Sequence, residues 1–250
     1  MTETKTKSVG RTFLIVEELA DSGAMTVSEI SENIGIPVST VHDYLQSLVQ
    51  MGYVTRENKQ YRPTTKFLEI GYQQLHRSEI YTAAESKLDE LAQQTDEHVT
   101  LMTEENGEGV LLDVREGDRS VNLLSYPGAR MPLHATAPGK AILAHMPSDR
   151  VDEIIEEQGL PALTKHTITD PERLRTQLSK IREQGYAVDD GERIAGMVLV
   201  AAPILDREDH VRAAICVAAP RNRFEGQREE QISSLVREAA NVIQVQIDYS

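Results

Sequence analysis

Residues 26–50 read Thr26-Val-Ser-Glu-Ile-Ser-Glu-Asn-Ile-Gly-Ile-Pro-Val-Ser-Thr-Val-His-Asp-Tyr-Leu-Gln-Ser-Leu-Val-Gln50, and this stretch decides the fold of the N-terminal part. Thr26 followed by Glu29 is a capping box, in which each side chain accepts from the backbone N–H of the other residue. Gly35-Ile-Pro37 is a tight turn, since glycine permits a left-handed backbone and proline suits a new helix start. The pattern predicts two helices joined by this turn, with apolar faces at Val27, Ile30 and Ile34, then at Val41, Leu45, Leu48 and Val49.

The flanking segments extend this pair of helices to a winged helix-turn-helix. A preceding helix is predicted over 9–20 and ends at the turn Asp21-Ser-Gly23. After the third helix, Tyr53–Glu57 and Gln60–Pro63 flank Asn58-Lys59, which predicts a two-stranded hairpin. We therefore assign residues 1–63 to the winged domain. The residues expected on the buried face of its first helix are Val9, Phe13, Val16, Leu19 and Ala20.

The rest of the chain is predicted to form a linker helix over 64–78 and a second domain over 79–250. Asn106-Gly-Glu-Gly109 predicts a hairpin turn, and Asp170-Pro171 starts a helix with a cap and a proline in its first turn. Strands mixed with helices and hairpins favour an α+β fold with a largely antiparallel sheet. The predicted strands lie near 98–103, 109–115, 120–125, 186–189, 197–204 and 211–218, and the helices near 136–146, 149–158, 170–184 and 225–247.

The composition argues against several classes of protein. No run approaches the roughly 18 apolar residues of a membrane span, and the first residues lack the apolar segment of a signal peptide, so a cytoplasmic protein is expected. The single cysteine, Cys216, cannot form an internal disulfide or a cysteine-based zinc finger. The seven histidines show no metal-binding spacing, and no glycine-rich phosphate loop is present. We predict no catalytic residue, metal or cofactor.

The charge is unevenly distributed along the chain. The net charge is −14, yet residues 1–78 carry eight Lys/Arg and nine Asp/Glu, so nearly all of the excess lies in the remainder. Only 8 of the 26 basic residues are lysine. A carboxylate-rich surface with few lysines is typical of proteins in a salt-rich cytoplasm, and we predict a halophilic host such as a haloarchaeon; the alternative is an ordinary acidic bacterial protein.

The third helix of the winged domain carries the candidate base-reading residues. A recognition helix presents polar side chains to base edges in the major groove, and glutamine suits the N6/N7 edge of adenine. The bases of the hairpin can contact phosphates or the minor groove. The predicted DNA-binding residues are Arg11, Thr26, Ser39, Thr40, His42, Asp43, Gln46, Ser47, Arg56, Lys59 and Arg62.

Three alternatives stay open at this point. Every amphipathic helix has a polar face, so these residues could serve solubility alone, or the winged helix could bind proteins rather than an operator. Asp43 repels phosphates, and could accept from cytosine N4, orient His42 or Gln46, or point away. A thiol enzyme using Cys216 would need a neighbouring base and an oxyanion site.

The second domain offers fewer signals. Ala135-Thr-Ala-Pro-Gly139 starts a helix at which N–H groups could hold a carboxylate, or is an ordinary helix start. Asp189 and Asp190 end a strand beside Gly191, where they could bind a ligand or form a turn. Cys216 stands among alanines and is better interpreted as a small buried hydrophobic residue.

Several motifs in order resemble the IclR-type transcriptional regulators. The matching segments are Ser8–Arg11, Thr26–Ile30, Gly35–His42, Gly52–Val54, Met131–Ala141, Leu163–Asp170, Arg182–Asp190 and Ala201–Pro203. The resemblance implies a winged-helix domain, a linker helix and a GAF-like effector domain. It also implies partners: double-stranded operator DNA, a second copy in a homodimer or a dimer of dimers, and a small-molecule effector such as an organic acid, an aromatic metabolite or a sugar-derived compound.

The resemblance also implies an effector site with chain-specific departures. Relatives often have Cys where Leu199 stands and small polar residues at Cys216 and Ala218, so this site is expected to be less polar. We expect Asp189 at its mouth, where it would favour a hydroxylated acid or sugar-derived compound over a dicarboxylate. Relatives often have Arg at the position of Asp43, so their operator does not carry over. The implied effector residues are Thr136, Ala137, Pro138, Gly139, Asp189, Met197, Leu199, Cys216 and Ala218.

The salt hypothesis predicts a fold that persists in concentrated KCl. At about 2 M KCl the Debye length falls below about 3 Å, so long-range charge attraction contributes little. Circular dichroism and operator binding should both persist there. Unfolding of the chain on addition of this salt would contradict the halophilic interpretation.

Overall fold

The computed structural model describes residues 5–224 and 226–249. The chain divides into two compact units, Met1–Gln74 and Leu75–Ser250. Within the described residues, no helix is long and apolar enough to cross a membrane. The predicted fold class, an N-terminal winged helix-turn-helix followed by an α+β domain with an antiparallel sheet, is confirmed.

The first unit is a winged helix-turn-helix. Its capping box forms as predicted: the Thr26 N–H donates to Glu29 Oε2 at 2.7 Å, and the Glu29 N–H donates to Thr26 Oγ1 at 3.4 Å. Gly35 ends the first helix of the pair with a left-handed backbone, φ 66°. The elements are α1 (Lys7–Ser22), β1 (Met25–Thr26), α2 (Val27–Ile34), α3 (Val38–Gln50), β2 (Val54–Glu57), β3 (Gln60–Pro63) and α4 (Lys66–Leu75), with strand order β1-β3-β2.

The wing is a two-residue hairpin. Asn58 and Lys59 both have positive φ, at 49° and 70°, as a type I′ turn requires. In the pairing of β2 with β3, Glu57 stands opposite Gln60, so the turn contains these two residues alone.

The buried face of α1 differs from the predicted one. Ile15 and Leu19 are fully buried, whereas Val9 and Phe13 are 51% and 55% exposed. The apolar residues of this helix cover a wider arc than the core of the first unit needs, and the sequence pattern does not say which side faces inward. Three of the residues predicted for the buried face, Val9, Phe13 and Ala20, therefore lie on the surface.

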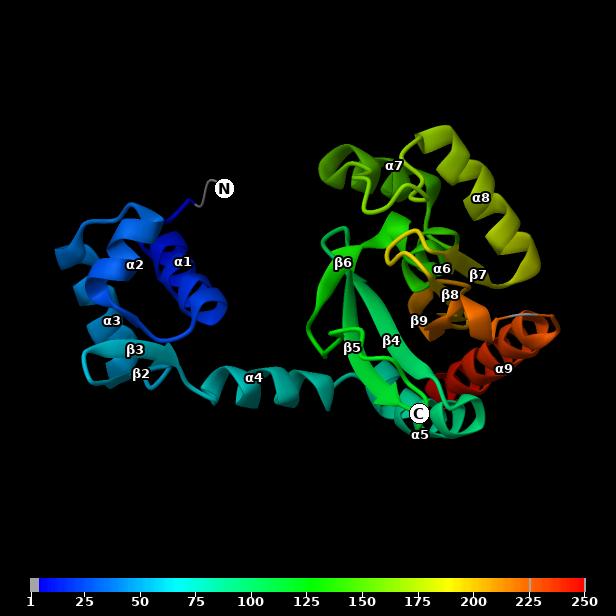
Figure 1. The fold of residues 1–250 in the computed structure, drawn as a ribbon, viewed down its shortest axis with the longest axis horizontal. Helices are drawn as coiled ribbons and strands as arrows, with labels where there is room; N and C mark the ends of the chain where they lie inside the picture. The colour runs from blue at the N-terminus through cyan, green and yellow to red at the C-terminus, as the bar shows by residue number, and fades with distance from the viewer. Residues whose placement is uncertain (1–4, 225, 250) are drawn as a thin grey trace. The chain divides into compact units, whose positions relative to one another are not determined.

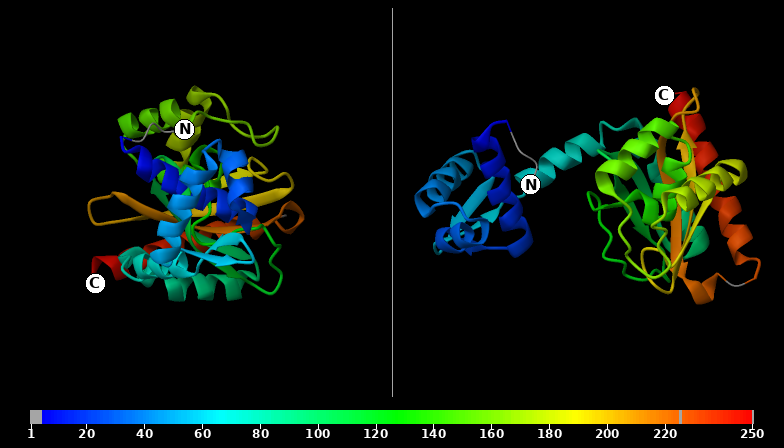
Figure 2. Two further views of the ribbon diagram at one scale, coloured as in Figure 1. Left: turned by 90° about the vertical axis from the view of Figure 1, so that its left-hand side faces the viewer. Right: turned by 90° about the horizontal axis from the view of Figure 1, so that it is seen from above.

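The second unit is a six-stranded antiparallel sheet covered by helices on both faces (Figures 1 and 2). Helices α5 and α9 cover one face and α6 the other, with α8 packed on α6. The strand order is β6-β5-β4-β9-β8-β7. The elements are α5 (Glu79–Thr95), β4 (His98–Glu105), β5 (Glu108–Glu116), β6 (Arg130–Pro132), α6 (Ala137–Leu143), α7 (Ser148–Gln158), α8 (Pro171–Gln184), β7 (Ala187–Asp190), β8 (Met197–Leu205), β9 (Val211–Pro220) and α9 (Arg228–Asp248).

The central strands are buried on both faces, and alternate residues face different helices. Val200 of β8 and Val217 of β9 belong to the core under α5 and α9, whereas Leu199, Cys216 and Ala218 belong to the core under α6. The residues that the resemblance implied for effector binding on these two strands thus share the α6 face.

Two predicted elements differ from those observed. Residues 120–125 form no strand, because Leu124 adopts a left-handed φ of 51° and its N–H donates to the Asn122 side chain at 2.9 Å. Arg130–Pro132 supplies the edge strand instead and pairs with β5. The last helix was predicted to begin near residue 225, which lies outside the described residues, and it is observed from Arg228.

Candidate DNA-binding surface and effector cavity

The polar face of α3 lies on the surface of the first unit. Val41, Leu45 and Leu48 bury the opposite face of the helix. The predicted base-reading residues on the outer face are Ser39, His42, Asp43, Gln46 and Ser47, which are exposed, and Thr40, which is half-buried.

Contacts within this face restrict what each side chain can do. His42 Nε2 lies 3.5 Å from Gln46 Nε2, so these two side chains form one polar unit. Asp43 is 86% exposed and lies 3.8 Å from His42 Nδ1, beside the histidine rather than against the core. Ser47 donates its hydroxyl to the Asp43 carbonyl at 3.0 Å, an i−4 bond within the helix that occupies its proton. His42 and Gln46 are therefore the best-placed readers.

The wing carries three basic side chains, which differ in whether neighbouring side chains hold them in place. Arg56 packs over the Tyr61 ring at 5.5 Å, and Arg62 lies 3.6 Å from Glu57. Lys59 is exposed at the tip of the turn. Of the other predicted contacts, Arg11 is exposed on α1, whereas Thr26 is engaged in its capping box. Lys59 is thus the wing cation best placed for phosphate.

The start of α4 is fixed to the winged domain. The Lys66 ammonium donates to the Met51 carbonyl at 2.8 Å and lies 4.5 Å over the Tyr53 ring. Phe67 packs against the same ring with centroids 5.1 Å apart. These contacts connect the first turn of the linker helix to the residues that directly follow α3.

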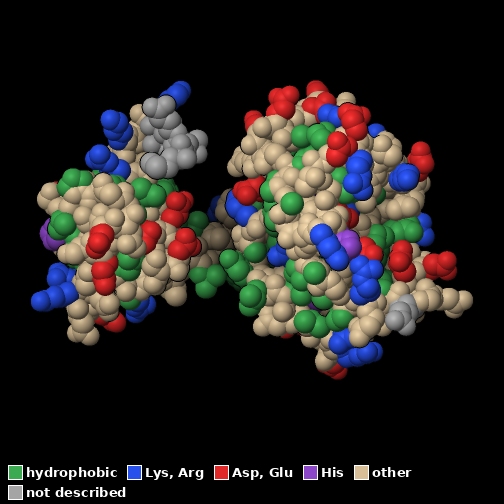
Figure 3. All heavy atoms as spheres, turned by 45° about the horizontal axis from the view of Figure 1, so that its top comes forward, with side chains coloured by type: hydrophobic (Ala, Val, Ile, Leu, Met, Phe, Trp, Pro, Cys, Tyr) green, Lys and Arg blue, Asp and Glu red, His purple; other side chains and the backbone are tan. Residues whose placement is uncertain are grey.

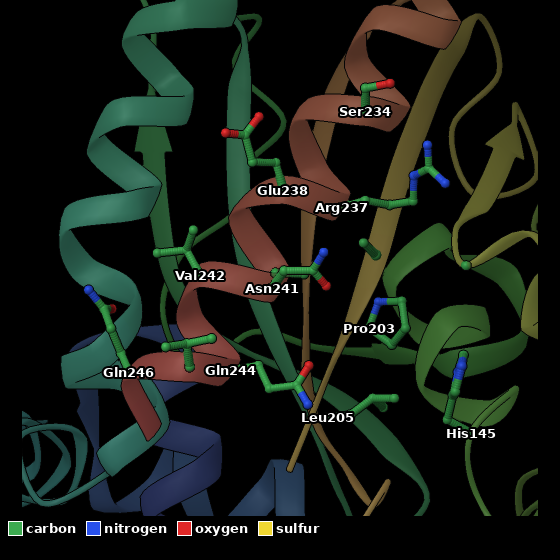
Figure 4. Close-up of a pocket in the computed structure, with 14 residues that line it drawn as sticks. His145, Pro203, Leu205, Ser234, Arg237, Glu238, Asn241, Val242, Gln244 and Gln246 are labelled. Carbon is green, nitrogen blue, oxygen red and sulfur yellow. The ribbon is translucent and has the colours of Figure 1, made fainter. Parts of the chain in front are cut away.

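The second unit contains an open groove of about 690 Å³ between α9 and β8. In Figure 4, Arg237, Glu238 and Asn241 extend from α9, and Pro203 of β8 lies across the groove from them. None of the predicted effector residues lines this groove. Its open, largely helical wall offers little enclosure for a small molecule.

A much smaller, partly open cavity of about 20 Å³ lies beneath the start of α6. Thr136, Pro138, Leu199 and Ala218 line it, as the resemblance implied. The other implied residues, Ala137, Gly139, Asp189, Met197 and Cys216, are buried but do not line it. The complete lining is His98, Thr100, Met102, Leu111, Leu123, Ser125, Met131, Thr136, Pro138, Arg193, Leu199 and Ala218.

The floor of this cavity follows from strand register. Ala218 of β9 stands between Leu199 of β8 and His98 of β4. In the next row, Cys216 stands between Ala201 and Thr100. The small side chains at the centre of these rows leave space under α6.

Two charged or titratable side chains in the lining are absent from the sequence-based set. His98 is 1% exposed, and neither ring nitrogen has a hydrogen-bond partner among the described residues. Burial lowers the pKa of His98, so the ring is neutral at pH 7. Arg193 is half-buried in the loop after β7, and desolvation lowers the pKa of its guanidinium. A histidine at the start of an apolar strand was the one signal available for this pair.

Helix α6 is held close to the sheet by its own residues. A Cβ at Gly139 would lie 2.2 Å from the Leu133 carbonyl oxygen, so only glycine permits this approach. The Gly139 N–H donates to Thr136 Oγ1 at 3.1 Å. The fully buried Lys140 ammonium pairs with Glu192 and donates to the Val188 carbonyl at 2.9 Å. These contacts join the start of α6 to the loop that carries Arg193.

Comparison with known proteins assigns both units of the chain to one family. The family model described as "Bacterial transcriptional regulator IclR C-terminal" matches residues 72–245, and the "IclR helix-turn-helix domain" matches residues 8–58. The chain belongs to the IclR family of transcriptional regulators. It is 30% identical over 239 residues to a probable regulator, ArcR, of Halobacterium salinarum, covering 94% of this chain and 91% of that protein. It is 30% identical over 244 residues to Escherichia coli KdgR, covering 97% and 93%.

Solved IclR-family structures share the whole fold. The Thermotoga maritima IclR structure superposes with a TM-score of 0.81 at 32% identity, covering 97% of this chain and 99% of that one. An IclR homologue from Microbacterium hydrocarbonoxydans, solved in complex with 4-hydroxybenzoate, superposes with a TM-score of 0.83 at 27% identity, covering 97% and 99%. The chain is therefore a regulator with a DNA-binding domain and an effector-binding domain, and not an enzyme.

The chemistry of Cys216 agrees with a regulator. The thiol is fully buried, and desolvation raises its pKa, so it stays protonated and is a poor nucleophile. Among the described residues, no group of three or more His, Cys, Asp and Glu side chains could hold a metal ion.

Asp189 does not stand at the mouth of the site as predicted, because it is fully buried in β7. Its Oδ1 accepts the Glu192 N–H at 2.6 Å, and its Oδ2 has no partner among the described residues. Burial raises the pKa of Asp189 to about 6. The carboxylate lies in the protein interior, and its free oxygen can accept only from a group that reaches it there.

The raised pKa predicts a pH-dependent effect of Asp189→Asn on stability. The folded state holds this proton up to about pH 6, whereas the unfolded chain releases it near 3.8. The cost of burying the charge is therefore absent below about pH 4 and complete above about pH 6. Thermal denaturation should show Asp189→Asn matching the wild type at about pH 4 and exceeding its unfolding free energy by up to about 3 kcal/mol at about pH 8.

Asp190→Asn provides the matched control. The exposed Asp190 pairs with Arg221, so its neutralisation should be neutral or slightly destabilising at about pH 8. An Asp189→Asn difference from wild type that is the same at both pH values would contradict the buried, proton-holding carboxylate.

Proposed function

We propose that this IclR-family regulator binds an operator sequence through α3 and the wing, and that a small catabolic metabolite bound in the second unit controls this binding. The observation that carries the proposal is the cavity under α6, formed in part by residues that the sequence had indicated. The proposed effector is a hydroxylated acid or a sugar-derived compound.

Operator reading is assigned to His42 and Gln46. A paired imidazole and amide on an exposed helix face can contact adjacent base edges, and glutamine can bond adenine in a bidentate manner. Lys59 at the wing tip would contact phosphate and supply affinity without choosing a sequence. Asp43, beside His42, is proposed to orient the imidazole; its exposure also suits a contact with cytosine N4.

The effector hypothesis rests on the chemistry of the cavity region. Met102, Leu111 and Leu199 supply apolar contact for the body of a ligand. The unpartnered Oδ2 of Asp189 would accept from a ligand hydroxyl that reaches it. The Microbacterium homologue was solved with 4-hydroxybenzoate, which is a hydroxylated acid. This is consistent with the class of ligand proposed here.

Binding must expand this cavity, and that expansion is the proposed signal. A volume of about 20 Å³ is close to the space for a single water molecule. Leu123 and Ser125 cover the cavity from the strand-free segment 117–129. A ligand that needs this segment displaced binds one state better than the other, and so shifts the equilibrium between them.

Assembly into at least a dimer is part of the proposal. One recognition helix spans few base pairs, so specificity calls for two half-sites about one helical turn apart. The first unit exposes Val9 and Phe13 on α1 and Leu68 and Ile70 on α4. We propose that copies meet through these apolar residues, as a homodimer or a dimer of dimers, in the cytoplasm where the DNA lies.

Two substitutions separate sequence reading from general affinity. Gln46→Ala should weaken operator binding by about 1–3 kcal/mol and relax selection at one base pair. Lys59→Gly removes the charge while placing glycine in a turn that favours it, so it should weaken all DNA sites about equally. Gel shifts with the chain's own upstream DNA and with single-base variants of it measure both effects.

Gln94→Ala is the matched control, since Gln94 lies exposed on α5 of the second unit and its side chain hydrogen-bonds to Glu90. Its operator affinity should equal that of the wild type. Unchanged affinity and selectivity in a double variant, His42→Ala with Gln46→Ala, would reject the reading assignment. Failure of the wild type to shift its upstream DNA would favour a protein-binding role instead.

A further inference from the structure

Several polar side chains contribute to the lining of the effector cavity, although most strand positions beneath α6 are apolar. His98 and Thr100 enter from β4, Thr136 from the start of α6, and Arg193 from the loop after β7. Apart from Ser125, the rest of the lining is apolar and includes Met102, Leu111, Met131 and Leu199. The cavity is therefore lined mainly by apolar side chains, with a histidine and an arginine among its few polar ones.

His98 is a buried polar group that has no hydrogen-bond partner among the described residues. Glu116 Oε1 lies 4.0 Å from its Nδ1, which is beyond hydrogen-bond distance, and both ring nitrogens are buried. Leaving a buried donor and acceptor unsatisfied costs about 1–3 kcal/mol, and such groups in native proteins call for an explanation. Because the ring lines the cavity, a ligand that enters it can satisfy one of these nitrogens.

Arg193 is the cation of the cavity. Among the described residues its guanidinium forms no ion pair, and the carboxyl group that acts on it most strongly is Asp189. The other buried cation nearby, Lys140, is already paired with Glu192. Arginine remains charged at neutral pH even when desolvated, and its planar donor set matches a carboxylate. The guanidinium is thus available for an anion at the cavity wall.

We propose that the effector carries a single carboxylate, held between the Arg193 guanidinium and the His98 imidazole, with an uncharged body against Met102, Leu111 and Leu199. This inference rests on the proposed function and specifies how its site recognises a ligand. The imidazole donates one N–H to the carboxylate, and Thr136 also lines the cavity. The buried Asp189 nearby would repel a second anionic group, which restricts the class to monocarboxylates.

Neither anchoring residue belongs to the set that the family resemblance implied. The strand positions that the resemblance implied carry weakly polar or apolar residues in this chain: Leu199, Cys216 and Ala218. The polar groups come instead from His98 on β4 and from Arg193 in the loop after β7. The proposed contacts to the acid thus lie on β4 and on the loop after β7, rather than on β8 and β9.

The test compares carboxylates with their uncharged primary amides. The probes are acetate, lactate, gluconate, benzoate and 4-hydroxybenzoate, each with its amide, titrated calorimetrically into the full chain. At least one acid should bind, and should bind more tightly than its amide. Arg193→Met should weaken that acid by about 10- to 100-fold, the loss expected for a charge-assisted hydrogen bond, and leave the amide unchanged.

His98→Phe distinguishes a ligand contact from a structural role. Phenylalanine fills a similar volume without unsatisfied nitrogens, so the unliganded variant should melt at the same temperature as the wild type or higher, yet bind the acid more weakly. Arg221→Met is the matched control, because Arg221 pairs with Asp190 and does not line the cavity. This control should bind the acid as the wild type does.

The outcomes separate this inference from the proposed function. Equal binding of acids and amides, equal binding by Arg193→Met, or no binding by any acid overturns carboxylate recognition at this site. A gel shift of the same wild-type preparation tests operator binding independently. Operator binding that responds to an amide or a neutral sugar would keep the proposed function and remove the inference.

Discussion

The buried ion pair between Lys140 and Glu192 is the interaction on which the second domain depends. It joins the start of α6 to the loop after β7, and Gly139 lets the same helix approach Leu133. Removing one partner would leave an uncompensated buried charge, a change that typically costs about 3–5 kcal/mol. With both in place, Thr136 and Pro138 cover a floor of small side chains, and Arg193 is brought to its edge. The cavity is a consequence of this attachment.

The two domains differ in net charge, and this difference affects how each one interacts with DNA and with salt. Acidic side chains crowd the second domain, where Figure 3 shows them gathered around α7, whereas the winged domain is nearly neutral overall. An anionic protein can bind DNA only if its contacting surface lacks this excess, and α3 with its wing fulfils that condition through polar readers and a few cations. In a salt-rich cytoplasm, screening would weaken repulsion between the acidic domain and DNA as well as attraction at the wing. Base-edge contacts and buried area then carry more of the specificity.

Local signals in the sequence were sufficient for the winged domain and not for the cavity. Thr26 with Glu29, Gly35, and Asn58-Lys59 each determine structure within a few residues, and all three formed as predicted. The strand expected at 120–125 was wrong, because a left-handed Leu124 interrupts an apolar run that otherwise looks extended. His98 and Arg193 were missed, since only the strand order β4-β9-β8-β7 brings them to one cavity. Asp189 was expected at an opening, but the pattern of a strand end does not reveal what covers it.

If occupation of the cavity under α6 controls operator binding, Leu199→Trp should abolish the response of the protein to its metabolite. An indole at this position should fill the cavity, because Leu199 lines it. Operator affinity of the full chain is measured by fluorescence anisotropy with and without a metabolite that alters binding by the wild type. Leu163→Trp, at an exposed position outside the cavity, is the control. The account predicts that Leu199→Trp binds operator but no longer responds, while Leu163→Trp responds normally. A Leu199→Trp protein that responds as the wild type does would contradict it.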